Sequence, residues 1–117
     1  MAKKILLVDD DPIFLTLAEL AIKKERTDVI ISKASNGEEA LEFIQKESVD
    51  IIFLDLNMPV MNGWEFLEAI DGKPLDSKIY ILTSSIDPSD RNKAEENPNV
   101  VSMLEKPLDR DKIGQTL

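Results

Sequence analysis

The hydrophobic residues of the chain gather in short unbroken runs, and amphipathic segments separate these runs. The runs predict strands at residues 4–8, 29–33, 49–54, 78–82 and 100–104. A run without alternating polar positions is typical of a parallel strand that is buried on both faces. We therefore expect five short strands in the interior of the protein.

Between these strands, apolar residues recur three or four positions apart, as they do on one face of a helix. The pattern predicts helices at residues 12–24, 63–70, 87–97 and 109–117, and a further helix that begins near Ser35. The sequence Ser35-Asn36-Gly37-Glu38 has the form of a capping box, with Ser35 as the cap. The helix at residues 87–97 differs from the others, because it has little apolar face beyond Ala94.

Strands that alternate with helices form a repeating β–α unit, so the sheet should be parallel with right-handed crossovers. At 117 residues, we expect an α/β fold in three layers. Its centre would be a doubly wound five-stranded parallel sheet with the flavodoxin-like strand order 2-1-3-4-5, and five helices would cover its two faces. The length suits one domain, so residues 1–117 are expected to form a single domain without a second one.

The charge and the missing residue types exclude several functions. With 14 basic and 23 acidic residues, the net charge is −9, and nucleic-acid phosphates would be repelled. The chain has no cysteine and no histidine, which leaves carboxylate, hydroxyl and lysine chemistry. No apolar stretch approaches the ~18 residues of a membrane span, and the run that ends before Asp9 is too short for a signal peptide. We expect a cytoplasmic protein that does not bind a membrane.

Polar residues directly follow four of the five predicted strands, at the edge of a doubly wound sheet where ligands bind. They are Asp9, Asp10 and Asp11 after the first strand, Asp55 after the third, Thr83, Ser84 and Ser85 after the fourth, and Lys106 and Pro107 after the fifth. Taken singly, an aspartate here is most often a turn or cap residue, and a lysine is most often solvated. Their joint occurrence at neighbouring strand ends favours a functional site.

Converging carboxylates repel one another and resist ionisation unless a cation compensates them. Mg²⁺ suits such a site, because it takes carboxylate oxygens together with water and phosphoryl oxygens. Lys106 and Thr83 would then serve as a cation and a hydrogen-bond donor for the remaining phosphoryl oxygens.

The order and spacing of these residues resemble the receiver domain of two-component response regulators, in particular the single-domain type similar to chemotaxis regulators. The resemblance covers nearly all 117 residues. It rests on the segments Leu7-Val8-Asp9-Asp10-Asp11-Pro12, Leu54-Asp55-Leu56-Asn57-Met58-Pro59, Met61-Asn62-Gly63, Thr83-Ser84 and Lys106-Pro107. The chain departs from the family at Met103, where Tyr or Phe is usual, and at Asn62, where Asp is common.

The resemblance implies a role for each residue of the site. Asp55 would be the phosphoacceptor, and Mg²⁺, or Mn²⁺ in its place, would be bound by Asp9, Asp10, Asp55 and the backbone carbonyl of Asn57. The phosphoryl group would be bound by Thr83, Ser84 and Lys106. Pro107 would follow a cis peptide bond, and Asn57 and Ser85 would tune the lifetime of the acyl phosphate.

By the same resemblance, the protein would be a signalling switch rather than an enzyme. A sensor histidine kinase or a histidine phosphotransfer protein would donate the phosphoryl group, and phosphorylation would alter a surface that binds a downstream protein. That surface would include residues 100–104 and the polar helix before them, with Met103 as an output-surface candidate. The charged residues of that helix fit either a solvated face or such an output surface. No direct contact with nucleic acid is expected.

Three other functions are compatible with parts of this pattern. A flavodoxin-type redox protein shares the fold, but its phosphate loop must attract an anion that residues 9–11 would repel. A phosphatase of the haloacid dehalogenase type also uses an aspartate nucleophile with Mg²⁺, but it needs a second acid where Asn57 stands. A degenerate receiver that only docks to partners would not need the complete set of Asp9, Asp10, Asp55, Thr83 and Lys106.

Overall fold

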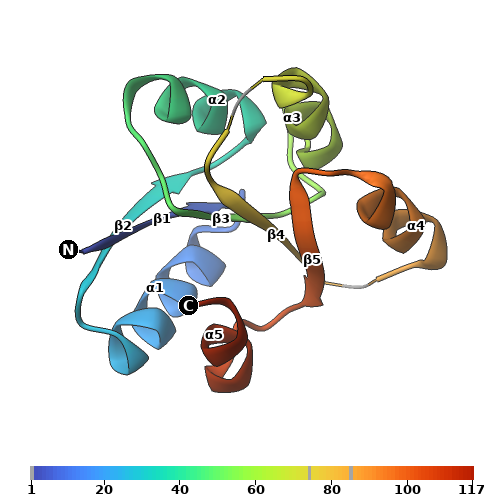
Figure 1. Cartoon of the computed structure of the whole chain (residues 1–117). Helices are drawn as coiled ribbons and strands as arrows, with labels where there is room; N and C mark the ends of the chain where they lie inside the picture. Colours follow the sequence, from blue (N-terminus) through green and yellow to red (C-terminus); the bar gives the residue numbers. More distant parts are fainter. Residues whose placement is uncertain (1, 74, 85) are drawn as a thin grey trace.

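Strands and helices alternate along the chain (Figure 1). The computed structural model describes residues 2–73, 75–84 and 86–117. Within these residues the elements are β1 (Lys3–Val8), α1 (Pro12–Glu25), β2 (Val29–Ala34), α2 (Gly37–Lys46), β3 (Ile51–Leu54), α3 (Gly63–Ile70), β4 (Lys78–Thr83), α4 (Pro88–Glu96), β5 (Val100–Glu105) and α5 (Arg110–Thr116). Neighbouring strands are parallel, and the sheet has the order β2-β1-β3-β4-β5. The predicted doubly wound α/β fold with flavodoxin-like strand order is confirmed.

The sheet separates two hydrophobic cores, which explains why the strand sequences are apolar without alternation. Successive side chains of a strand point to opposite faces of the sheet. Leu6 and Ile52 therefore belong to the core under α2, α3 and α4, whereas their neighbours Leu7 and Phe53 belong to the core under α1 and α5. Figure 1 shows these two groups of helices on opposite sides of the sheet. In the described part of the chain, no helix has both the length and the apolar character that crossing a membrane requires.

Helix α2 begins one residue later than the predicted cap implies. Asn36 is the N-cap residue, and its side chain accepts a hydrogen bond from the backbone N–H of Glu39 at 2.9 Å. The Glu39 carboxylate in turn accepts a hydrogen bond from the backbone N–H of Ser35. The predicted pairing of Ser35 with Glu38 is wrong, because two cap patterns overlap in this segment and Asn caps a helix as well as Ser does.

Strand β3 is shorter than predicted, because it begins at Ile51 rather than at Val49. Val49 is buried, but its carbonyl accepts a hydrogen bond from Ser77 Oγ at 2.6 Å rather than from a neighbouring strand. Hydrophobic burial and strand pairing therefore end at different residues here.

An irregularity in β5 decides which of its side chains face α4. Ile79 pairs with Val100, but the next residue, Tyr80, pairs with Ser102, so Val101 is an extra residue of β5. A bulge of this kind shifts the alternation of side chains by one position. As a result Val100 and Met103, three residues apart, both pack against the core under α2, α3 and α4.

Candidate functional site

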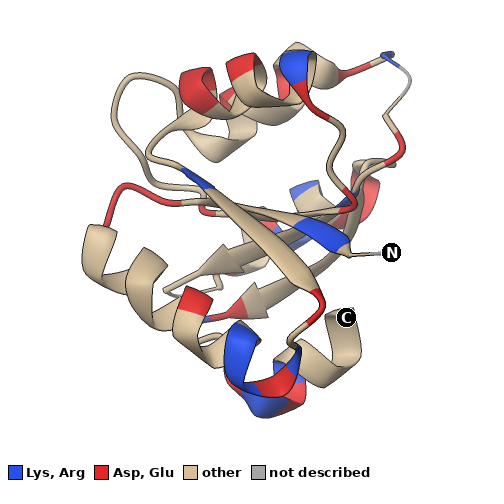
Figure 2. Ribbon diagram, turned by 90° about the vertical axis from the view of Figure 1, so that its left-hand side faces the viewer, with Lys and Arg blue, Asp and Glu red and all other residues tan. Residues whose placement is uncertain are grey.

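The ends of β1 and β3 bring three carboxylates together. Asp9 and Asp10 follow β1, and Asp55 follows β3, which is the adjacent strand. One carboxylate oxygen from each residue lies within 4.8 Å of the other two, and we call this group the acidic pocket. Asp9 and Asp55 are buried, at 2% and 6% exposure, while Asp10 is exposed. Figure 2 shows the acidic turn after β1 as a red segment that leads into α1, whose first turns are uncharged.

The acidic pocket is an unfavourable environment for the charge of Asp55. Burial of the Asp55 carboxyl, together with the nearby Asp9, raises the pKa of Asp55 from 3.8 to about 6. Lys106 and the backbone N–H groups of Asn57 and Leu56 lower this pKa, but their combined effect is smaller. A cation in the pocket would favour the ionised form of Asp55.

Lys106 is the cation of the site. Its ammonium group lies 2.6 Å from Asp9 Oδ2 and 3.8 Å from Asp55 Oδ1. The ring centroid of Phe14, on α1, lies 4.3 Å from the same nitrogen. The backbone N–H of Lys106 donates to the carbonyl of Thr83 at 2.7 Å, which joins the end of β5 to the end of β4. In this state the ammonium group pairs mainly with Asp9.

Of two structural features around Lys106, one was expected from the sequence and the other was not. The peptide bond between Lys106 and Pro107 is cis, and this conformation was expected from the resemblance to receivers. The contact with Phe14 was not predicted, because the helical pattern identified Phe14 only as part of an apolar face. Its position in the first turn of α1, directly after the aspartates, was the available signal.

The remaining predicted residues lie at the same edge of the sheet and differ in exposure. Thr83 is the last residue of β4 and is 1% exposed, whereas Ser84 after it is exposed. Asn57 is exposed, two residues beyond Asp55. Ser85 lies outside the described residues.

The loop between β3 and α3 folds back onto Asp55, and Gly63 makes this approach possible. A Cβ atom at Gly63 would lie 2.4 Å from the carbonyl oxygen of Asp55, closer than any side chain can approach. The N–H of Gly63 donates to the carbonyl of Leu56 at 3.0 Å. Asn62 and Glu65 then form a capping box at the start of α3. The helix therefore supports the backbone that carries Asp55.

The acidic pocket has the donors that a hard divalent cation requires. All three groups of the pocket offer carboxylate oxygens, which suit Mg²⁺ and Mn²⁺ better than metals that prefer nitrogen or sulfur. Asp9 already accepts two hydrogen bonds, from the backbone N–H of Asp11 on Oδ1 and from Lys106 on Oδ2. The residues present therefore fit a cation of this class.

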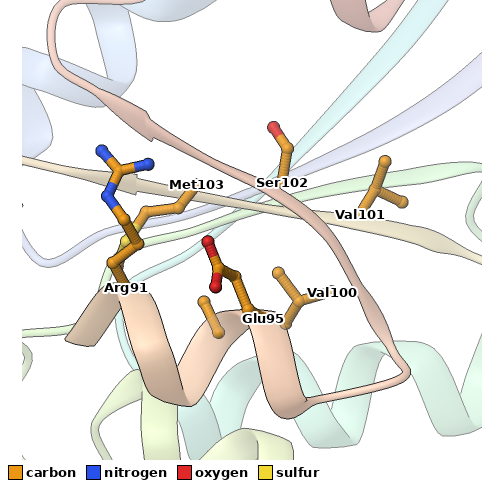
Figure 3. Close-up of a pocket in the computed structure, with 7 residues that line it drawn as sticks. Arg91, Glu95, Val100, Val101, Ser102 and Met103 are labelled. Carbon is orange, nitrogen blue, oxygen red and sulfur yellow. The ribbon is translucent and has the colours of Figure 1, made fainter. Parts of the chain in front are cut away.

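A pocket of about 370 Å³ lies between α4 and β5, where the output surface was expected. It is lined by Arg91, Ala94, Glu95, Val100, Val101, Ser102 and Met103. Figure 3 shows Met103 extending from β5 toward Arg91, and Glu95 reaching from α4 toward the strand. Met103 is partly buried and also packs against the core, so this side chain joins the core to the pocket.

Comparison with known proteins identifies the family of this fold and site. Residues 5–117 match the response regulator receiver domain, and the chain therefore belongs to that family. The family consists of signalling switches rather than true enzymes. The triad of Asp9, Asp10 and Asp55 is typical of the metal site of receivers.

Individual relatives are similar over part or all of their length. Nitrate/nitrite response regulator protein NarL of Escherichia coli (strain K12) is 38% identical over 81 residues, so the match spans 69% of this chain but only 38% of NarL. Two-component response regulator ORR41 of Oryza sativa subsp. japonica is 30% identical over 122 residues, which cover 100% of this chain and 95% of ORR41. A two component response regulator from Cytophaga hutchinsonii has a solved structure with a TM-score of 0.89 and 29% identity, over 97% of this chain and 92% of that one.

Proposed function

We propose that this protein accepts a phosphoryl group on Asp55 in a Mg²⁺-dependent reaction and thereby alters a protein-binding surface. The observation that carries the proposal is the environment of Asp55. This 6% exposed carboxylate shares the acidic pocket with Asp9 and Asp10 and lies 3.8 Å from the ammonium group of Lys106. A nucleophile, ligands for a cation and a positive charge for phosphoryl oxygens therefore lie within one small volume.

The proposed reaction at Asp55 is a phosphoryl transfer. A carboxylate oxygen of Asp55 forms a bond to phosphorus, while the bond from phosphorus to the imidazole nitrogen of the donor breaks and its electron pair leaves with the donor. With acetyl phosphate, the bond that breaks is the one to the acyl oxygen. The product is an acyl phosphate on Asp55. Asp55 must be ionised to react, and Lys106 together with two backbone N–H groups favours that form.

Asp10 and Asp55 are the proposed direct ligands of Mg²⁺, with the backbone carbonyl of Asn57 as a further ligand. Both carboxylate oxygens of Asp9 already accept hydrogen bonds, which supports a contact with the metal through water. When bound, the metal neutralises negative charge on the phosphoryl oxygens. Mn²⁺ would substitute, because it takes the same oxygen ligands.

Lys106, Thr83 and Ser84 are the proposed contacts of the phosphoryl group. Phosphorylation adds a charge of about −1.5 to −2 close to the ammonium group of Lys106. Thr83 ends β4, and its hydroxyl would donate a hydrogen bond to a phosphoryl oxygen, while the exposed Ser84 leaves room for the donor. The backbone N–H of Lys106 donates to the carbonyl of Thr83, so a displacement at the end of β4 would also move the end of β5.

The surface formed by α4 and β5 is the proposed output surface. Met103 joins the core to the pocket between these elements, so a displacement at the ends of β4 and β5 would change the shape of the pocket. Methionine is unbranched and flexible, and we therefore expect Met103 to follow the change without two well-defined positions.

The proposed phosphoryl donor is a sensor histidine kinase or a histidine phosphotransfer protein. Its contact surface would include the exposed face of α1, whose first half is uncharged (Figure 2) and on which Ile13, Leu17 and Leu20 are 71%, 60% and 60% exposed. Apolar side chains exposed together beside a reactive site favour contact with a protein. A cytoplasmic location belongs to this proposal, because kinases of this class draw phosphate from ATP inside the cell.

Mass spectrometry after incubation with acetyl phosphate tests the reaction. We expect a single added phosphoryl group in the presence of Mg²⁺, and none in Asp55→Asn or after chelation of the metal. Asp76→Asn removes an exposed carboxylate elsewhere and should be labelled like the wild type. Equal labelling of wild type and Asp55→Asn would contradict the assignment of Asp55.

Two further measurements test the proposed switch. Amide chemical shifts with and without a phosphoryl mimic should change within residues 84–96 and 100–106, and unchanged shifts there would rule out the α4–β5 surface. Asn57→Lys should change the half-life of the acyl phosphate while labelling is retained, because Asn57 is exposed beside Asp55.

A further inference from the structure

Lys112, in the first turns of α5, reaches back to the segment that carries Lys106. Its ammonium group donates to the carbonyl oxygen of Glu105 at 2.5 Å and to that of Pro107 at 3.1 Å. These two carbonyls belong to the residues on either side of Lys106. One side chain therefore holds the backbone before and after the lysine of the site.

The position of Lys112 is itself well defined. Its backbone N–H donates to the side chain of Asp109, the N-cap residue of α5, at 3.0 Å. The Lys112 side chain is 24% exposed, so the ammonium group is partly removed from water and its hydrogen bonds to carbonyls gain strength. Ile113, the next residue, is 1% exposed and anchors α5 in the core.

The segment around Lys106 is thus fixed from two sides. On one side, the backbone N–H of Lys106 donates to the carbonyl of Thr83 at the end of β4. On the other side, Lys112 holds the two flanking carbonyls from α5. The ammonium group of Lys106 must lie near Asp9 and Asp55 at the same time, and small displacements of its backbone would change both distances.

We propose that Lys112 is a positioning residue for phosphorylation, which acts by holding the backbone on both sides of Lys106. The inference rests on the proposed function of Asp55, and it assigns to Lys112 no contact with the phosphoryl group. The family motifs named above do not include this position.

Lys112→Met tests the role, because methionine keeps an unbranched apolar chain and removes the donors. We expect phosphorylation of Asp55 by acetyl phosphate to become roughly fivefold slower, the order expected for the loss of hydrogen bonds that position a reacting group. The affinity for Mg²⁺ should stay unchanged, because the carboxylates of the acidic pocket are untouched. Lys112→Arg keeps donors at this position and should recover most of the rate.

Arg110→Met is the matched control. Arg110 lies on the same helix, and its substitution removes the same charge. The side chain of Arg110, however, is 86% exposed and pairs with Glu25 of α1 at 3.0 Å. We expect wild-type phosphorylation rates for this variant. An equal loss in Arg110→Met and Lys112→Met would overturn the inference, since the effect would then follow from net charge or from the docking of α5.

A double-mutant cycle with Lys106→Met separates positioning from general stabilisation. If Lys112 acts through Lys106, adding Lys112→Met to Lys106→Met should slow phosphorylation no further. The same fivefold loss in both backgrounds would show that Lys112 acts by another route, and the proposal would be dropped.

The outcomes distinguish this inference from the proposed function. A wild-type protein that is not phosphorylated contradicts both. A phosphorylated wild type with an equally fast Lys112→Met contradicts only the role of Lys112. Should Lys112→Met fail to fold by circular dichroism, Lys112→Gln supplies the measurement, because its amide can still donate to one carbonyl and should give an intermediate rate.

Discussion

Helices α3 and α4 cover the same face of the sheet (Figure 1) and have similar lengths, yet they are attached to it very differently. The buried residues of α3 are Gly63, Phe66, Leu67 and Ile70. Ala94 is the one buried residue of α4, all of whose positions the structure describes. The ammonium group of Lys93 on α4 lies 4.9 Å from the ring centroid of Trp64 on α3.

This difference matches the tasks proposed for the two regions. α3 follows directly from the loop that carries Asp55, so its packing holds this proposed nucleophile in place. α4 borders the pocket that contains Met103, and few buried contacts place a helix at the low end of local stability. A region that must stay fixed and a region that can be repositioned therefore lie side by side on one face.

Phe66→Ala should give the largest effect of the variants that test this comparison. Phe66 is 0% exposed in the core under α2, α3 and α4, and its truncation should lower the free energy of unfolding by about 3–5 kcal/mol. Arg91→Ala, at an exposed position of α4, should change it by less than about 0.5 kcal/mol. Urea unfolding followed by circular dichroism measures both. Similar losses would mean that α4 is anchored as firmly as α3.

Asp55→Asn should stabilise the metal-free protein at neutral pH. The carboxyl of Asp55, in the loop before α3, is ionised at a cost in free energy, because it is buried in the acidic pocket beside Asp9. The pKa of Asp55 is about 6 in the folded protein against an ordinary value of 3.8, so the folded state binds the proton more tightly. Stability contributed by this group is therefore greatest below pH 3.8 and declines as the pH rises through 6. Allowing for partial solvent screening, the gain at pH 7.5 should be about 1–2 kcal/mol.

Thermal unfolding of both proteins in a chelating buffer checks this sign. The advantage of Asp55→Asn should shrink toward zero near pH 4, where Asp55 is protonated in the folded wild type. Added Mg²⁺ should stabilise the wild type more than the variant, because the variant has lost a charged ligand. A wild type that is the more stable protein at pH 7.5 without metal would show that the acidic pocket carries no such cost.

Much of this architecture could be predicted from the sequence because it depends on periodicity and on strand ends. The apolar runs identified the strands, and Asp9, Asp55 and Lys106 met at one sheet edge because parallel strands end there together. Burial was a poorer guide to boundaries: Val49 is buried without belonging to β3. Sequence patterns report which residues leave water, but not which backbone groups pair.

The features that escaped prediction depend on contacts between distant segments. The bulge at Val101 turns Met103 toward α4, and no local sequence pattern in β5 predicts this bulge. Phe14 contacts Lys106, and Lys112 binds the carbonyls on either side of it. These two residues lie on helices at opposite ends of the chain, and each has an ordinary helical pattern in its own segment. The capping box of Asn62 and Glu65 is the local exception: it was visible in the sequence, but Asn62 was noted only as a departure from the family.

Substitutions of the N-cap residues of α3 and α4 form a matched pair, with smaller expected effects on stability. Asn62→Ala should lower the free energy of unfolding of the whole protein by about 1 kcal/mol, because α3 unfolds only when the core does. Asp87→Ala removes the side chain that accepts from the N–H of Asp90, and it should speed amide hydrogen exchange within α4 while leaving the rest of the protein unchanged. A global loss of protection in Asp87→Ala would contradict the weak coupling of α4.

Lys93→Met should have the smallest effect on global stability and still alter α4. Lys93 is exposed while Trp64 is half-buried, and such a pair contributes about 0.5–1 kcal/mol. Because Ala94 is the buried anchor of α4, losing this contact should raise local opening of the helix by roughly two- to fivefold, as measured by hydrogen exchange. Trp64 is the chain's one tryptophan, so its fluorescence should change in the same variant.

Lys46→Met, at the end of α2, is the control and should leave both signals unchanged. Unchanged exchange in Lys93→Met would mean that packing between α4 and β5 alone holds the helix, and the contact with α3 would then be incidental.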